Sequence, residues 1–313
     1  MIRYLSSRVA GMAAVMLIVA TVVFFITRLA PGDPAAVMLG EQASAADIAK
    51  LRASYGLDRP LPVQFGYWLK ELAHGNLGES IFLQRPVTRA LAERTEPTFF
   101  LTLFSLVIAM LIGVPCGIAA AVWRGRAIDQ ALSGFAMLGA SIPSFWLGLL
   151  LMEIFAVGLG WFPVAGYGEP GVPLSVRLHH LALPAIVLGV VNSALILRFT
   201  RASMLDVLGE DHIRTARAKG VPETRVVLQH ALRNALIPVI TIVGLTFALL
   251  IGGAIVTETV FGLPGIGNLV VSAVLRRDYP VIQGALLVIA ALYVLINLAI
   301  DLLYLLIDPR VKY

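Results

Sequence analysis

The chain has 313 residues, of which 58% are hydrophobic and only 14% are charged, with a formal net charge of +5. A soluble domain carries about 25% charged residues, so this composition excludes an ordinary soluble protein and makes the lipid bilayer the expected solvent. The single cysteine, Cys116, excludes an internal disulfide and a cysteine-based metal site, and its place in an apolar run predicts a small packed side chain.

Six runs are apolar enough to be membrane-spanning helices, which need roughly 20 residues each. They cover residues 9–27, 98–122, 131–157, 181–197, 235–257 and 281–307. The first run exceeds the roughly 7–15 apolar residues of a signal peptide, so we expect an uncleaved span. Pro143, Pro184 and Pro238 are expected to kink or end the helices that contain them. The sequence thus predicts an all-α polytopic membrane protein with six transmembrane helices.

The long segment between the first two spans predicts an extracytoplasmic subdomain. Ser44 suits the N-cap of a helix beginning near Ala45, with Tyr55 and Gly56 at its end, and residues 64–73 predict a second, amphipathic helix rich in aromatics. We therefore divide the chain into residues 1–29, 30–97 and 98–313. The basic residues of this loop suit electrostatic steering of an acidic partner: Lys50, Arg52, Arg59, Lys70, Arg85, Arg89 and Arg94.

Lysine and arginine are sorted along the chain in a way that predicts orientation. With the N-terminus inside, the inner segments carry twelve basic residues and the short outer loops carry three. Both termini and the loop at residues 201–234 are then expected in the cytoplasm. The same sorting explains the positive net charge without a nucleic-acid partner.

The cytoplasmic loop predicts two helices joined by a glycine corner. Residues 203–219 favour one helix with Gly220 as its C-terminal cap, and Pro222 and Glu223 suit the start of a second helix that runs to about Leu236. Small alanines among basic residues favour insertion into a groove of a soluble partner. The candidate coupling residues are Arg214, Thr215, Ala216, Arg217, Ala218, Lys219 and Gly220.

On the outer face, residues 261–267 are too rich in glycine and proline for a regular helix and predict a turn that neighbouring helices shield from lipid. Together with two arginines of the long loop they form a candidate surface for docking an extracytoplasmic protein. Its residues are Arg85, Arg89, Phe261, Gly262, Pro264 and Gly265.

A polar stripe lies on the sixth span, where Asn297, Asp301 and Tyr304 follow helical spacing. We expect this stripe to be buried against protein, with Asp301 paired to Arg198 or Arg201.

For other polar residues in or near the spans, the sequence favours structural or interfacial roles over substrate or metal binding. Glu153 is expected to reach the outer surface, with a place in the substrate path left open. His179 and His180 are adjacent, so they project in different directions on a helix and do not predict a metal site.

Two runs in and next to the predicted cytoplasmic loop at residues 201–234 resemble a known family. Arg-Thr-Ala-Arg-Ala-Lys-Gly at residues 214–220 and His-Ala-Leu-Arg-Asn-Ala-Leu-Ile-Pro at residues 230–238 are similar to the cytoplasmic loop of inner-membrane permeases of ATP-binding-cassette (ABC) importers. More narrowly, they resemble the dipeptide, oligopeptide, glutathione and nickel branch. The resemblance covers nearly the whole chain, including residues 29–34, 55–58, 85–87, 201–204, 277–283 and 308–313. The Glu-Ala-Ala of the broader superfamily is Arg214, Thr215 and Ala216 here.

The resemblance implies a type I ABC importer permease fold in a bacterial inner membrane. It also implies a paralogous permease partner in a heterodimer, two ATP-binding subunits and an extracytoplasmic substrate-binding protein. The chain has no Gly-x-x-x-x-Gly-Lys-Ser/Thr phosphate loop, so ATP and Mg²⁺ are expected on the partner ATPases and no enzyme activity or cofactor is expected here. Peptides are the first expected cargo, with glutathione and nickel left open.

Two functions of other classes compete with this interpretation: a self-contained secondary transporter and a membrane receptor subunit. A secondary transporter is expected to show internal inverted repeats, and we see no convincing repeat. Co-purification of an ATPase with substrate-stimulated turnover would separate the three.

Overall fold

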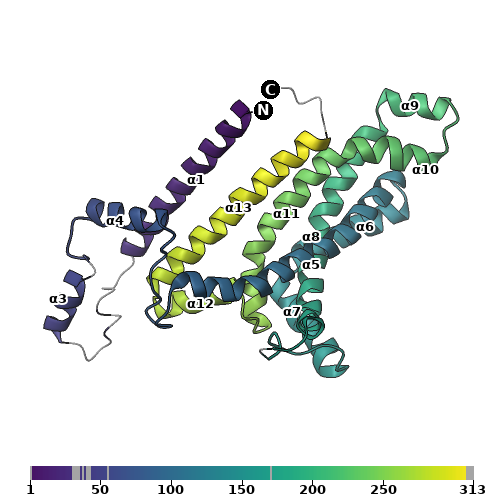
Figure 1. The fold of residues 1–313 in the computed structure, drawn as a ribbon. Helices are drawn as coiled ribbons and strands as arrows, with labels where there is room; N and C mark the ends of the chain where they lie inside the picture. Colours follow the sequence, from purple (N-terminus) through teal and green to yellow (C-terminus); the bar gives the residue numbers. More distant parts are fainter. Residues whose placement is uncertain are drawn as a thin grey trace. The chain divides into compact units, whose positions relative to one another are not determined.

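A computed structural model describes residues 2–29, 36, 39, 44–54, 56–169 and 171–307, and most of these residues are helical (Figure 1). In chain order the helices are α1 (Ile2–Leu29), α3 (Ala45–Ser54), α4 (Leu61–Ala73), α5 (Val87–Val122), α6 (Ala127–Ser141), α7 (Ser144–Leu151), η1 (Met152–Gly158), α8 (Leu174–Leu208), α9 (Asp211–Ala218), α10 (Glu223–Arg225), η2 (Val226–Ala231), α11 (Leu232–Val260), α12 (Ile266–Arg276) and α13 (Tyr279–Ile307). The elements η1 and η2 are π-helical. In this described part the only β-type pairing is an isolated bridge between Glu79 and Pro86, so the expected all-α class is confirmed.

The membrane-spanning helices agree with the predicted set. In the described residues, five helices are long and apolar enough to cross a membrane, and a bent pair, α6 with α7–η1, makes up to six. That pair is bent by 99° at Pro143, where a break was predicted. Pro184 and Pro238, in contrast, lie inside the continuous helices α8 and α11 and do not end them. A spanning helix tolerates such prolines when neighbouring groups satisfy the freed carbonyls.

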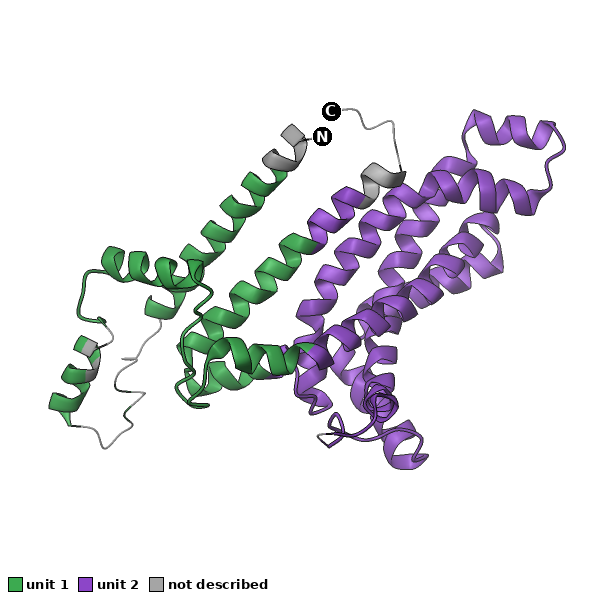
Figure 2. Cartoon of the chain, viewed as in Figure 1, with its two compact units in different colours: residues 1–95, 269–295, 313 green, residues 96–268, 296–312 purple. Residues whose placement is uncertain are grey.

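The chain divides into two compact units, which are described separately (Figure 2). Unit 1 consists of residues 1–95, 269–295 and 313, and unit 2 of residues 96–268 and 296–312. The long helices α5 and α13 contribute residues to both units.

In unit 1, aromatic side chains join α1 to α4. Phe24 is fully buried, and its ring centroid lies 5.2 Å from that of Phe65 and 5.4 Å from that of Trp68. Gln283 of α13 donates a hydrogen bond of 2.5 Å to Thr27 Oγ1 of α1. The amphipathic helix predicted at residues 64–73 thus exists as α4, and its aromatic side holds the end of the first span.

The preceding helix of unit 1 also begins where the sequence predicted. The amide of Asp47 donates to Ser44 Oγ at 3.2 Å, which makes Ser44 the N-terminal cap of α3. The helix ends at Ser54, and Gly56 has a φ of +63°, which suits the turn that follows. The predicted terminator Tyr55 lies outside the described residues.

In unit 2, α8 is the central helix and α5 packs closely against it. A Cβ atom at Gly113 would lie 2.8 Å from Cβ of Ile196, and one at Gly117 would lie 2.6 Å from Cβ of Thr200. The two glycines follow the Gly-x-x-x-Gly spacing, which lets two helix backbones approach within a membrane. This contact fixes the helix that leads into the candidate coupling loop.

Candidate coupling loop

The loop begins with a short helix, α9, that is separate from α8. Residues 203–219 were predicted as one helix, and this prediction is wrong: α8 ends at Leu208, and α9 runs only from Asp211 to Ala218. Gly209 lies at the break, and glycine is among the least favourable residues inside a helix. Asp211 then occupies the first turn of α9, where a carboxylate favours the positive helix end.

One face of α9 packs against the chain's own helices. Ile213 is fully buried and Ala216 is 9% exposed, three positions further along the helix. Both belong to an apolar cluster whose other buried members are Ala121, Met204, Val207, Val226, Val227, Ala231 and Ala235. The cluster anchors α9 to α8 and η2, so the loop is a packed element and not a loose tether.

A glycine corner closes α9. The amide of Gly220 donates to the carbonyl of Arg217 at 2.9 Å, and the amide of Val221 donates to that of Ala216 at 3.2 Å. This pair of bonds is the Schellman motif, which places a left-handed residue after the helix. Gly220 has a φ of +75°, so its predicted role as a cap is confirmed. Pro222 then precedes α10, as predicted.

An ion pair spans the corner. Arg217 donates from Nη2 and Nε to the two carboxylate oxygens of Glu223 at 2.6 and 3.1 Å. The hydrogen bonds to Glu223 hold the pKa of Arg217 above its ordinary value. Both side chains remain accessible, so this pair contributes little to stability. The pair links α9 to the first residue of α10 across the corner.

The second helix is continuous with a membrane span. It was predicted to run to about Leu236 and lead into the fifth span. The helical run from Glu223 passes through α10, η2 and α11 and ends at Val260. The segment that follows the glycine corner is therefore continuous with a membrane span.

The opposite face of α9 is open to a partner. Of the predicted coupling residues, those exposed on or next to α9 are Arg214, Thr215, Arg217, Ala218, Lys219 and Gly220. Ala216 was expected to let the helix enter a partner's groove, and this expectation is wrong because Ala216 packs inside the chain's own cluster. Ala218 is the exposed small residue that remains for that role.

The outer turn at residues 261–267 is partly inaccessible. Phe261 is 2% exposed and Gly265 is also buried, so neither fits the predicted docking surface as it stands. Gly262 and Pro264 are exposed. The turn itself, between α11 and α12, was predicted from its glycines and proline.

Sequence reasoning missed Glu258, which organises this turn. Its side chain is fully buried at the end of α11, and Oε2 accepts a hydrogen bond of 3.0 Å from the amide of Asn268. A Cβ atom at Gly267 would lie 2.9 Å from the same oxygen. The available signal was the Thr-Glu-Thr sequence at the end of an apolar run, with a glycine-rich stretch just after it.

The other two docking candidates belong to unit 1. Arg85 Nη1 lies 2.7 Å from Glu93 Oε2, and Arg89 Nε lies 3.2 Å from Glu93 Oε1. One carboxylate therefore neutralises part of the positive charge that was expected to steer a partner.

The polar stripe on α13 is less buried than expected. Asn297 is exposed and Asp301 is half-buried in this chain, and the side chain of Tyr304 lies outside the described residues. The suggested pairing of Arg201 with Asp301 is not what the structure shows, because Arg201 bonds Asp129.

The paired histidines have separate partners. His179 Nε2 lies 3.0 Å from the carbonyl of Trp161, and His180 Nδ1 lies 3.0 Å from that of Gly166. Across the described residues no group of three or more His, Cys, Asp or Glu side chains could hold a metal ion. Glu153 is exposed within η1.

Comparison with known proteins defines the class. Residues 113–313 match the family of binding-protein-dependent transport system inner membrane components, and residues 1–102 match the N-terminal part of the same kind of component. The chain belongs to this family: it is a multi-pass permease subunit of an ABC importer of the bacterial inner membrane.

Individual relatives narrow the comparison. The chain is 46% identical to the "Probable peptide ABC transporter permease protein y4tP" of Sinorhizobium fredii, with 99% of each chain covered. It is 47% identical to the "Glutathione transport system permease protein GsiC" of Salmonella typhi, with 100% of each chain covered. Among solved structures, an inward-facing MetNI methionine ABC transporter matches 71% of this chain and 97% of its own, with a TM-score of 0.58 and 21% identity. That last likeness concerns the fold alone.

Proposed function

We propose that this permease forms half of a pathway for short peptides and is driven through α9 by a separate ATP-binding subunit. ATP and Mg²⁺ are then bound by that subunit and not by this chain. The observation that carries the proposal is the two-sided α9: Ile213 and Ala216 fix it to the bundle, while Ala218 and Lys219 stay exposed beside the glycine corner.

The exposed face suits a partner of opposite charge. Arg214, Arg217 and Lys219 surround Ala218, and a small residue between cations lets a helix enter a shallow acidic groove. Within the chain, Arg214 is paired with Asp211 and Arg217 with Glu223. In the described structure Lys219 is bonded to no carboxylate, so its positive charge is the one available to a partner.

The cargo proposal rests on the two relatives. One is named for peptides and the other for glutathione, which is itself a tripeptide. A passage for short peptides includes both. A binding protein and a second, paralogous permease complete the proposed assembly. Nickel is the other cargo of this branch, and the chain offers no observation that favours it.

The test uses the assembled transporter in proteoliposomes. Wild-type complex should take up labelled dipeptides or glutathione in proportion to ATP hydrolysis. Ala218→Trp should detach or uncouple the ATPase, because the bulky ring cannot enter the groove. Leu228→Trp, an exposed residue on the next helix, is the size-matched control.

The outcomes are distinct. Uptake without ATP would identify a secondary transporter, and a tightly bound soluble partner without uptake would identify a receptor. Ni²⁺ uptake with no peptide uptake would reject the proposal that short peptides are the cargo. An Ala218→Trp variant with wild-type uptake and hydrolysis would show that α9 does not enter an ATPase groove.

A further inference from the structure

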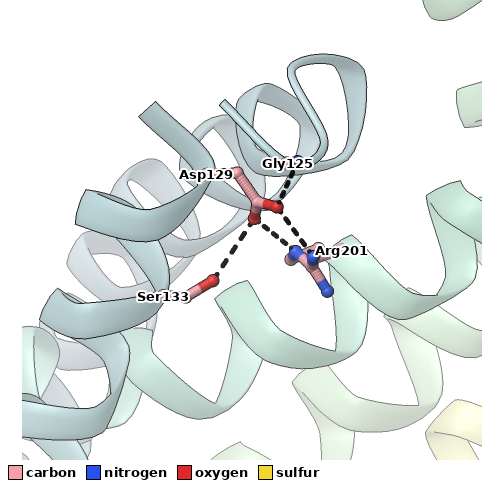
Figure 3. A network of polar contacts seen from close by, with 4 residues as sticks. All are labelled: Gly125, Asp129, Ser133 and Arg201. Atoms are coloured by element: carbon pink, nitrogen blue, oxygen red, sulfur yellow. Dashed lines mark hydrogen bonds and ion pairs between the residues drawn. The ribbon is translucent and has the colours of Figure 1, made fainter. Parts of the chain in front are cut away.

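A partly buried ion pair joins two helices of unit 2 near the candidate coupling loop. Arg201 Nε donates to Asp129 Oδ1 at 2.7 Å, and Arg201 Nη2 donates to Asp129 Oδ2 at 2.9 Å (Figure 3). Asp129 lies in the first turn of α6, with its side chain 8% exposed, and Arg201 lies in the last two turns of α8, with 30% exposed. The geometry is a two-point contact, which fixes orientation as well as distance.

The same carboxylate holds the turn before α6. Oδ2 also accepts from the amide of Gly125 at 2.9 Å, and Ser133 Oγ lies 3.3 Å from Oδ1 (Figure 3). Gly125 has a φ of +77°, a conformation that other residues rarely adopt. Asp129 therefore ties together the α5–α6 turn, the first two turns of α6 and the end of α8.

Arg201 lies directly before the residues that hold α9. Met204 and Val207, on the next turn of α8, belong to the apolar cluster that contains Ile213 and Ala216 of α9. The last turns of α8 are thus packed against α9 through this cluster, and the ion pair joins α8 to α6. From α6 the chain continues through the bend at Pro143 into α7 and η1.

We infer that Asp129 and Arg201 are positioning residues that transmit the movement of α9 to the broken span α6–α7. This inference rests on the proposed function, because it requires α9 to be moved by an ATPase. Transmission needs the forked geometry of the pair and not merely its neutrality. A guanidinium resists rotation about the contact, whereas a lysine ammonium is a point charge that does not.

Two variants separate transmission from folding. Arg201→Lys keeps the charge pair and loses the fork. The double variant Asp129→Asn with Arg201→Met removes both charges, and a side-chain oxygen at position 129 can still accept from the amide of Gly125. Arg177→Lys is the matched control: Arg177 lies near the other end of α8, is equally exposed and is bonded to a single carboxylate, Glu96.

The measurement is the number of substrate molecules taken up per ATP hydrolysed in proteoliposomes, with complex assembly and melting temperature measured in parallel. We expect both test variants to assemble and hydrolyse ATP, while this ratio falls by about fivefold or more, the lower end of allosteric coupling effects. Arg177→Lys should keep the wild-type ratio.

Any other result for the two variants counts against the inference. If both variants keep the wild-type ratio of uptake to ATP hydrolysis, the ion pair has no role in transmission. If neither variant assembles, the pair is a folding contact, and the inference is overturned as well. Absence of ATP-driven uptake by the wild-type complex would instead reject the proposed function, so the two failures are distinguishable.

Discussion

Thr98 Oγ1 donates a hydrogen bond of 2.5 Å to Oε1 of the buried Glu258, and the same hydroxyl accepts one of 2.9 Å from the amide of Ile266. One side chain of α5 thereby holds both the end of α11 and the start of α12 in unit 2. The backbone amide of Leu263 also donates a hydrogen bond of 2.8 Å to the carbonyl of Glu258. The outer turn is therefore organised from inside by polar groups, although the sequence around it is apolar.

Thr98→Val removes this donor and leaves the shape of the side chain almost unchanged. We expect a loss of about 1–3 kcal/mol of stability, since a buried acceptor loses its partner. The measurement is the thermal melting temperature of the purified permease. Thr259→Val is the control, because that hydroxyl is exposed and bonds only a carbonyl of its own helix. Equal melting temperatures for the two variants would show that the buried bond is not needed.

Gly220→Ala tests the corner after α9. No atom lies within 4 Å of the position where a Cβ would stand, so the cost comes from the left-handed backbone alone. That cost is about 1–2 kcal/mol for most residues. We expect weaker ATPase retention on co-purification for Gly220→Ala and near-normal retention for Gly220→Asn, because asparagine tolerates this conformation. Equal retention in both variants would contradict a role for the backbone conformation.

Gly113→Ala tests the close approach of α5 and α8. The added methyl would meet the carbonyl of Ser193 at 2.8 Å and the side chain of Ile196. Overpacking of this kind typically costs about 1–3 kcal/mol, which should appear as a lower melting temperature and less inserted protein. Gly134→Ala in α6 has open space around it and should be neutral or stabilising. A Gly113→Ala variant as stable as Gly134→Ala would contradict tight packing.

Orientation can be read by labelling with an impermeant thiol reagent. Leu275 is 80% exposed on α12, and Thr224 is exposed after the glycine corner. In a Cys116→Ser background, a cysteine at position 275 should react from outside intact cells, and one at position 224 should react only after permeabilisation. The basic-residue bias predicts this pattern. The reverse pattern would invert the predicted topology.

The ion pairs of Glu93 revise the docking prediction. Because Glu93 neutralises part of Arg85 and Arg89, the variant Glu93→Gln should free their positive charge. Association with an acidic binding protein should then strengthen, and the gain should shrink as salt screens the charges. Binding measured on the assembled transporter over a salt series is the check. Weaker or unchanged binding at low salt would exclude steering by these two arginines.

The elements that sequence predicted well were those with a local physical cause. Ser44, Gly220 and Pro143 act through their own backbone or the first turn beside them, so their effects were visible in the sequence. The spans followed from length and apolarity alone. What failed depended on contacts between distant segments: Ala216 reads as a generic small residue until Val226 and Met204 are seen around it.

The same limit explains the missed ion pair and the missed carboxyl. Asp129 and Arg201 are 72 residues apart, and Thr98 and Glu258 are 160 apart. The sequence suggested Arg201 only as an ion-pair partner of Asp301, because helical spacing singles out the polar stripe on α13. A single sequence carries no direct signal for which of several charges meet across a bundle.

The bend at Pro143 also determines what can surround this chain. Helix α6 has 15 residues, or about 22 Å at 1.5 Å per residue, which is less than the roughly 30 Å thickness of a hydrocarbon layer, so the bend falls within the apolar segment that α6 shares with α7 and η1. A helix end leaves carbonyl or amide groups without partners, and hydrocarbon chains cannot solvate them. Lipid alone therefore cannot surround the chain at the bend. The peptide groups beside Ile142 must face protein or water. The bend therefore marks a place where the lipid-facing surface of the permease meets the surface that faces protein or water.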